Sequence, residues 1–259
     1  ALCGRVIESV TIMLPRQLKH PDPEDFRVLV RGQRIERVAR RGKYLLIHLQ
    51  EGAHLVFHLR MTGSLVYEPH GTAAETGHTR MVFSFAGGGA LRFSDIRTFG
   101  CVYGFAAGEE IAVPGLQSLG PEPLSDDFTS SYLAAAIKGR RQPVKSFLLD
   151  QRRIAGLGNI YADEALFLAR IDPRRAAGSL SAAECRRLAE AVRKVLRDGI
   201  ADGGTTFRDY RNGAGESGHH QEHLYVYHRE GKPCPACGRP VEKITVGGRG
   251  THFCPCCQR

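Results

Sequence analysis

The stretch Asp150-Gln-Arg-Arg-Ile-Ala-Gly-Leu-Gly-Asn-Ile-Tyr-Ala-Asp-Glu164 decides the fold of the second half of the chain. Apolar helical patterns over Val144 to Leu149 and Ile160 to Ala169 flank it, which predicts two helices joined by a tight glycine turn. We expect Asn159 to cap the second helix, where free backbone N–H groups can bind an anion. The alternative is an ordinary packing joint with a routine cap, because Gly-x-Gly alone is a weak signal.

Two more helices are expected around this turn. One begins near Ser125-Asp126-Asp127 and continues through Tyr132 to Ile137. The other runs from Ala182 to about Asp198, and the residues Ser181 and Glu184 at its start fit a capping box. The second half of the chain is therefore predicted to be helical.

The first half of the chain, from Gly4 to about Phe105, has a strand-like pattern instead. Short runs of β-branched and aromatic residues alternate with glycine-rich breaks, which favours an antiparallel sandwich or barrel. These runs are Val28–Val30, Lys43–Leu49, His54–Leu59, Met81–Phe85 and Cys101–Phe105.

Five of the eight cysteines lie in the last 26 residues. Their pattern is C-x₂-C-x₁₆-C-x₂-C, which predicts a structural zinc site with no open coordination position. The ligands are expected to be Cys234, Cys237, Cys254 and Cys257, with Cys256 as a bystander. The alternatives are free thiols or two disulfides. Alternating residues between the two cysteine pairs predict a hairpin with Arg249 at its tip, where it could meet a phosphate or simply face solvent.

Composition and charge narrow the class of partner. The 259 residues carry 36 Lys and Arg against 27 Asp and Glu, a formal charge of +9, which favours a polyanion. The excess of positive charge is greatest near the cysteines, because the residues from Arg229 to the end of the chain include six basic and two acidic ones. The apolar runs are too short for a membrane helix, and Ala1-Leu-Cys-Gly-Arg has neither a Met nor the apolar core of a secretory signal.

Together these motifs closely resemble the bacterial formamidopyrimidine-DNA glycosylases, the helix-two-turn-helix repair enzymes that also include endonuclease VIII. The resemblance covers essentially the whole chain. Its motifs are Arg41–Leu46, His58–Ser64, Asp95–Gly100, Leu119–Pro123, Leu148–Glu164, Gly203–Thr206, Tyr225–Tyr227 and Gly248–Thr251, with the cysteine tail. The implied fold is α+β and multidomain: a β-sandwich over 1–118, a helix-two-turn-helix domain over 119–215, and a zinc-finger β-hairpin within 216–259.

The resemblance implies a bifunctional DNA glycosylase and AP lyase that flips an oxidised purine out of the duplex. A proline amine would form a Schiff base, a glutamate would handle protons, and β,δ-elimination would cut the strand. The family opens with Pro-Glu-Leu-Pro-Glu and a short helix, whereas this chain matches only after that helix. The proline and glutamate are therefore expected upstream of Ala1.

Several roles carry over from the family by position. Lys43 resembles the lysine that assists base release, and Arg249 resembles the arginine that grips a phosphate in δ-elimination. Asn159 resembles the asparagine that holds the phosphate beside the lesion. His78, Arg97 and Arg141 resemble further DNA contacts. From their charge alone, Arg141 and Lys145 are also expected to neutralise the DNA backbone.

Three residues bear on the choice of lesion. Met61, Arg97 and Phe99 resemble the side chains that fill the space left by the extruded base in the purine-specific branch, with Arg97 against the opposite cytosine. Core packing on strands is the alternative for Met61 and Phe99. The loop from Asp209 to Leu224 resembles the loop that covers an everted base, with Glu216, His219 and His220 as its polar residues.

The sequence thus predicts a monomer that binds double-stranded DNA containing an oxidised purine or an abasic site. It would hold one structural Zn²⁺ and no organic cofactor, bind no membrane, and work in the bacterial cytoplasm at the nucleoid. One alternative is an endonuclease VIII-like enzyme for oxidised pyrimidines. The other is a non-catalytic, zinc-dependent protein that binds damaged DNA, should the proline be lost.

Overall fold

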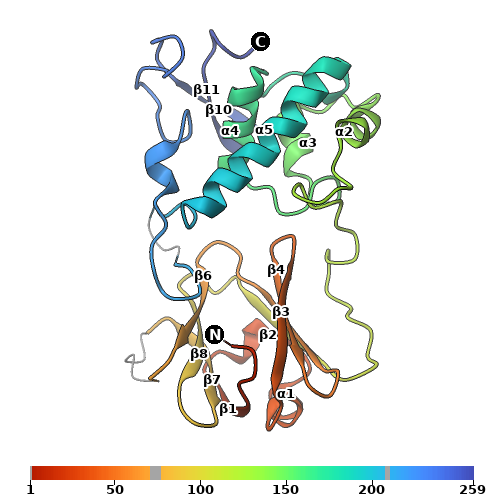
Figure 1. The fold of residues 1–259 in the computed structure, drawn as a ribbon, viewed down its shortest axis with the longest axis vertical. Helices are drawn as coiled ribbons and strands as arrows, with labels where there is room; N and C mark the ends of the chain where they lie inside the picture. Colours follow the sequence, from red (N-terminus) through yellow and green to blue (C-terminus); the bar gives the residue numbers. More distant parts are fainter. Residues whose placement is uncertain (1, 71–76, 208–210) are drawn as a thin grey trace. The chain divides into compact units, whose positions relative to one another are not determined.

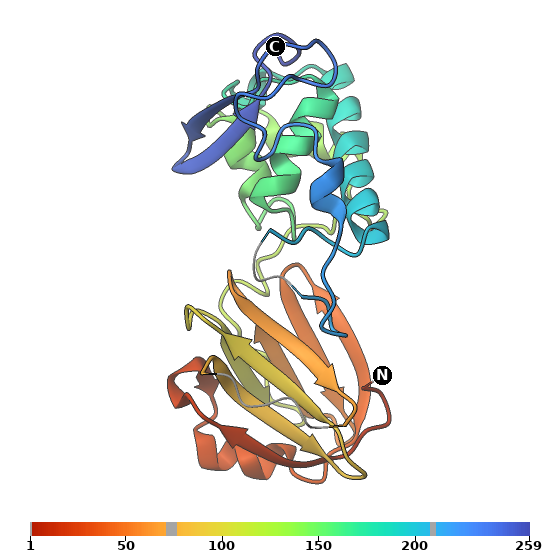
Figure 2. The same ribbon diagram turned by 90° about the vertical axis from the view of Figure 1, so that its left-hand side faces the viewer.

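The computed structural model describes residues 2–70, 77–207 and 211–259, which form two compact units (Figures 1 and 2). The N-terminal unit contains residues 1–117 and the segment Thr205–Gly218. The C-terminal unit contains Ser118–Gly204 and His219–Arg259. None of the helices in the described ranges is long and apolar enough to cross a membrane.

Two sheets face each other in the N-terminal unit, as Figure 2 shows. The four-stranded sheet is antiparallel, and in the five-stranded sheet only β2 and β9 run parallel. The first sheet has the order β1 (Ile7–Ile12), β7 (Thr79–Phe85), β8 (Ala90–Asp95), β6 (Gly63–Glu68). The second has the order β2 (Leu18–His20), β9 (Cys101–Phe105), β5 (His54–His58), β4 (Tyr44–Leu49), β3 (Ile35–Arg41). The predicted sandwich is confirmed.

Aromatic side chains from both sheets form the centre of this sandwich. Phe57 of β5 meets Phe83 of β7 and Phe93 of β8 edge to face, with ring centroids 6.0 and 6.1 Å apart. Edge-to-face pairs at this distance are favourable beyond the apolar area they bury. Strand β7 alternates between buried and half-buried residues along its whole length, as a strand with one face in the core must.

One predicted strand is wrong: Val28–Val30 ends helix α1 (Pro23–Val30). The Asp22 carboxylate caps this helix by accepting from the N–H groups of Glu24 and Asp25, and Pro23 occupies its first position. The short β-branched run that suggested a strand is instead the last turn of a helix, with Val30 buried and Val28 78% exposed.

Helices dominate the C-terminal unit, as predicted. They are α2 (Ser130–Ile137), α3 (Val144–Leu149), α4 (Asn159–Ala169) and α5 (Ala182–Ala201). The capping box of Ser181 and Glu184 is confirmed at the start of α5. The expected helix start at Ser125-Asp126-Asp127 is wrong, because Thr129 caps α2 through the N–H of Tyr132. Short 3-10 turns occur at η1 (Pro15–Gln17), η2 (Ala177–Ser179) and η3 (His220–His223).

The predicted hairpin consists of β10 (Glu242–Val246) and β11 (Arg249–Phe253). Val246 pairs with Arg249, so the turn is only Gly247-Gly248. Both glycines have positive φ, +56° and +74°, the pattern of the type I′ turn that matches the twist of paired strands. Arg249 therefore begins a strand directly beside the turn.

Candidate nucleic-acid interface

Met61, Arg97 and Phe99 lie together on the surface of the N-terminal unit. The Arg97 guanidinium donates to Met61 Sδ at 3.2 Å, and its Cζ lies 4.8 Å from the centre of the Phe99 ring. Met61 is 69% exposed and Phe99 is 52% exposed, so neither packs in the core. We call this group the wedge cluster. Its exposed thioether and ring, bridged by a cation, are suited to enter a gap in a base stack.

A buried carboxylate, Asp95, holds the wedge cluster in place. Its Oδ1 accepts from the Thr62 hydroxyl at 2.6 Å, and Thr62 Oγ1 in turn accepts from the N–H of Arg97 at 3.0 Å. Its Oδ2 accepts from Gln17 Nε2 and from the N–H of Gly100, each at 2.8 Å. The loop that carries Met61 and the loop that carries Arg97 and Phe99 are therefore both fixed to the fully buried Asp95. The sequence alone does not reveal this role of Asp95.

Lys43 lies in the two-residue turn between β3 and β4, where Arg41 pairs with Tyr44. Gly42 has φ +56° at the first position of this turn, which places the lysine at the end of a rigid hairpin. The exposed Lys43 lines a mostly apolar cavity of about 630 Å³ within the N-terminal unit. An amine at the mouth of an apolar cavity can meet a reacting group that is partly shielded from water.

The motif His58-Leu-Arg60, which follows strand β5, contains a residue with a left-handed backbone conformation. Arg60 has φ +58°, a left-handed conformation that favours glycine. Its N–H donates to Nδ1 of His58 at 3.1 Å. Burial, with the Arg60 charge as a second cause, lowers the pKa of His58 to about 4, so this imidazole is a neutral acceptor at physiological pH.

In the C-terminal unit, Lys145 is not available to DNA, which corrects the sequence prediction. Its side chain is fully buried, with Nζ 2.6 Å from Oδ1 of Asp163. It also donates to Gly250 O and Thr251 Oγ1, each at 2.8 Å. Burial lowers the pKa of Lys145, and the Asp163 carboxylate opposes that shift. The lysine joins α3 and α4 to the hairpin instead of neutralising a phosphate.

Asn159 and Arg249 lie close together as a result. Asn159 Nδ2 donates to the carbonyl of Gly250, the residue after Arg249, at 3.0 Å. Asn159 is the first residue of α4 and not its cap; the cap position belongs to Gly158, so that prediction is wrong by one residue. Arg249 is exposed at the start of β11. An amide, a helix start and a guanidinium thus share one patch, which suits a phosphate.

A second acid on α4, Glu164, fixes the chain that leads into the zinc finger. Its carboxylate accepts from the N–H groups of Tyr225, Val226 and Tyr227 at 2.7 to 2.9 Å. Burial raises the pKa of Glu164, while these three donors oppose the shift. Consecutive N–H groups on one carboxylate hold that backbone in a single path.

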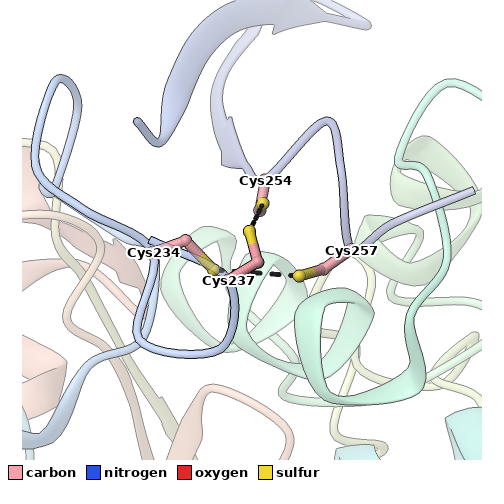
Figure 3. Close-up of side chains that lie close together, drawn as sticks. All are labelled: Cys234, Cys237, Cys254 and Cys257. Carbon is pink, nitrogen blue, oxygen red and sulfur yellow. Dashed lines mark hydrogen bonds between the residues drawn. The ribbon is translucent and has the colours of Figure 1, made fainter. Parts of the chain in front are cut away.

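The four predicted zinc ligands converge, as Figure 3 shows. Sγ of Cys234 lies 3.9 Å from Sγ of Cys257, and Sγ of Cys237 lies 3.5 Å from Sγ of Cys254. A tetrahedral site with Zn–S bonds of about 2.3 Å places its sulfurs about 3.8 Å apart, so the residues fit the ion. No disulfide joins any of the eight cysteines, all of which lie in the described ranges. When bound, zinc supplies structure, because four thiolates leave no position for water.

The remaining predicted contacts are spread over the two units. His78 and Arg141 are exposed. Residues 209 and 210, the first two of the predicted lesion loop, lie outside the described ranges. Glu216 is exposed and accepts from Asn212 Nδ2 at 3.0 Å, and His219 is exposed. His220, the third polar residue expected in this loop, is buried, with its Nδ1 2.8 Å from Oδ2 of Asp202.

The two-sheet unit carries an exposed wedge cluster, and the helical unit carries a β-hairpin beside a four-cysteine site. This combination is the fold of a class of DNA-repair proteins. Three family descriptions match the chain in order. "Formamidopyrimidine-DNA glycosylase N-terminal domain" covers residues 1–102, "Formamidopyrimidine-DNA glycosylase H2TH domain" covers 119–211, and "Zinc finger found in FPG and IleRS" covers 231–259. The chain belongs to the formamidopyrimidine-DNA glycosylase family.

Individual relatives and solved structures support the same family. A formamidopyrimidine-DNA glycosylase of Moorella thermoacetica is 54% identical over 92% of this chain and 86% of its own length. The solved MutM (Fpg) protein of Thermus thermophilus has a TM-score of 0.88 at 45% identity, over 99% of this chain and 92% of that one. The Lactococcus lactis Fpg, solved with DNA containing an abasic site, has a TM-score of 0.92 at 33% identity, over 100% and 94%.

The Lys145–Asp163 pair yields a stability prediction. Replacing Lys145→Met leaves a buried, unpaired carboxylate, so the free energy of unfolding should fall by about 3–5 kcal/mol. The double variant Lys145→Met/Asp163→Leu should recover much of that loss, because neither charge remains. Urea unfolding of both single variants and the double variant measures the coupling. A double variant whose loss equals the sum of the two single losses would contradict the pairing.

Proposed function

We propose that this chain excises oxidised purines, such as 8-oxoguanine and formamidopyrimidines, from duplex DNA and cleaves the strand at the resulting abasic site. The wedge cluster is the observation that carries the proposal. A base can be attacked only after it leaves the stack, and the space it leaves must be filled. Met61 and Phe99 are exposed apolar side chains with no core to fill, and Arg97 between them can pair with the opposite base.

The other site residues take roles by their position in the fold. Lys43, on its hairpin beside the apolar cavity, is proposed to assist base release and β-elimination. Asn159 and Arg249 are proposed to hold the phosphate beside the lesion, with Arg249 acting in δ-elimination. His78 and Arg141 add exposed contacts to the DNA backbone, and Glu216 and His219 lie in the loop proposed to cover the base. Since the substrate is chromosomal DNA, we expect the protein at the bacterial nucleoid.

Borohydride trapping of the full-length protein on lesion-containing duplexes tests the activity. A Schiff-base intermediate should be reduced to a stable protein–DNA adduct on 8-oxoguanine opposite cytosine, and far less on a duplex with an oxidised pyrimidine. Equal trapping on both lesions would favour the endonuclease VIII-like alternative. A full-length protein that binds the lesion duplex and forms no adduct would show a binding protein without this chemistry.

The wedge cluster makes a separable prediction. Met61→Ala and Phe99→Ala should each weaken lesion excision by about tenfold or more, because the unstacked step costs a few kcal/mol and loses part of its filler. Their urea midpoints should hardly change, since both side chains are exposed. Val28→Ala, which truncates another exposed apolar residue of the same unit, is the matched control and should leave excision unchanged. Excision as fast in both wedge variants as in this control would remove the cluster from the mechanism.

Arg249 should act on binding regardless of DNA sequence. Arg249→Ala removes one phosphate contact, so affinity should fall on lesion and undamaged duplexes alike. The slope of log K against log salt should flatten by about one unit. Arg186→Ala, at an exposed arginine on α5, is the comparison variant. An unchanged salt slope in Arg249→Ala would contradict the phosphate role.

A further inference from the structure

A second group of ligand-type side chains, away from the four cysteines, occupies the C-terminal unit. Asp202 follows the end of α5, and His220 and His223 lie on η3. One oxygen of the carboxylate, Oδ2, lies 2.8 Å from Nδ1 of His220 and 2.7 Å from Nδ1 of His223. The three ligand atoms lie within 4.8 Å of one another.

We propose that Asp202, His220 and His223 form a second metal site, for a divalent transition ion of the zinc class. Two imidazoles and one carboxylate are a donor set that suits zinc and its neighbours, and imidazole binds them through either ring nitrogen. Three protein ligands leave open positions for water, unlike the four-thiolate site. The second site should therefore bind more weakly and exchange more readily.

The site is preorganised by contacts that do not depend on an ion. The N–H of His219 donates to Asp202 O and the N–H of His220 donates to Gly204 O, each at 3.0 Å. The His220 ring is buried and stacks on Tyr161, with centroids 5.6 Å apart. Tyr161 in turn reaches α5 where Gly199 lacks a side chain, since a Cβ there would lie 2.4 Å from its hydroxyl. Ligands held this way lose little freedom on binding.

The site is also open on one side. His223 has 62% of its side chain exposed and Asp202 has 26%, whereas His220 has 6%. All three line a surface pocket of about 270 Å³, together with Lys194 and Asp198. Lys194 Nζ is paired with Asp198 Oδ2 at 2.8 Å, so its charge is balanced within the pocket. An ion can therefore enter from solvent and keep water on its open side.

For histidines in their neutral form, binding needs only a change of tautomer. In the absence of an ion, each Nδ1–H donates to the shared carboxylate oxygen. With an ion, each Nδ1 lone pair binds the metal and the proton resides on Nε2, so no proton is lost from a neutral imidazole. The carboxylate changes from acceptor to ligand, and an anion replaces part of the hydration of the ion.

The proposed metal site lies where the segment Thr205–Gly218 leaves and rejoins the C-terminal unit. The segment Thr205–Gly218 departs directly after Gly204 and returns at His219, and it packs with the N-terminal unit, for example through Tyr67 N to Gly213 O at 3.0 Å. Asp202 lies just before the segment, and His220 and His223 lie just after it. An ion held by all three would join the two ends of the segment by coordination as well as by hydrogen bonds.

Metal counting on the holoprotein tests the proposal. The protein, with its cysteine site loaded with one Zn²⁺ per chain, is dialysed against graded free Zn²⁺ at pH 7.5 and its zinc content is measured. Wild-type protein should take up a second equivalent, and Zn²⁺ should raise its thermal midpoint. Because loss of an outer-shell partner alone costs about 10–100-fold in metal affinity, loss of a ligand in His223→Gln or Asp202→Asn should weaken this uptake by at least about tenfold.

His219→Gln is the matched control. His219 is exposed, its neighbour is Glu222 at 3.8 Å, and it contributes no ligand to the group, so this variant should retain the second equivalent. His223 is mostly exposed on a short turn, so His223→Gln tests the site without removing a buried side chain. A wild-type protein that saturates at one equivalent would overturn the proposal. A second equivalent that persists unchanged in both His223→Gln and Asp202→Asn would also overturn it.

Discussion

The buried ion pair of Lys145 and Asp163 is the contact on which the arrangement of the C-terminal unit depends. An unpaired charge at this depth would cost several kcal/mol, so each partner requires the other. The pair joins α3 to α4, and its remaining bonds go to the hairpin: the lysine to Gly250 O and Thr251 Oγ1, and the aspartate to the N–H of His252 at 2.9 Å. The position of the hairpin on the helices is thereby specified by charge and hydrogen bonding, not by apolar packing alone.

The N-terminal unit uses a related device. Asp95 is fully buried and accepts from Thr62, Gln17 and Gly100, which fixes the loops that carry Met61, Arg97 and Phe99. In both units an internal carboxylate holds backbone segments from distant parts of the sequence, and the side chains suited to DNA extend outward from those segments. An exposed group that must fill a gap or grip a phosphate gains precision when the backbone behind it cannot move.

The strongest predictions from sequence were those with a local physical cause. The cysteine spacing predicted the four zinc ligands, because each CxxC turn aims two thiolates at one point, and Ser181 with Glu184 predicted the start of α5.

The predictions that are wrong concern contacts between distant residues or very short runs. The sequence suggests a DNA contact at Lys145 because a lysine near other basic residues is usually solvated, and its partner Asp163 is 18 positions away. Such pairing becomes visible only when α3 and α4 are packed. The contact of His220 is hidden from the sequence for the same reason, since its partner Asp202 lies on the other side of the segment 205–218. The strand predicted at Val28–Val30 is wrong because a β-branched run of three residues is too short to distinguish a strand from one helical turn.

Both proposed reactive cations lie at two-residue turns: Lys43 is the second residue of one turn, and Arg249 directly follows the other. Lys43 follows Gly42, with φ +56°, and Arg249 follows Gly247 and Gly248, with φ +56° and +74°. A two-residue turn leaves no free length of chain, so a side chain in the turn or next to it is held at the end of the paired strands. A longer loop could reach as far, but it would lose conformational freedom on every binding event. Glycine at these positions permits the backbone geometry, and the paired strands on either side of each turn limit how far the cation can move.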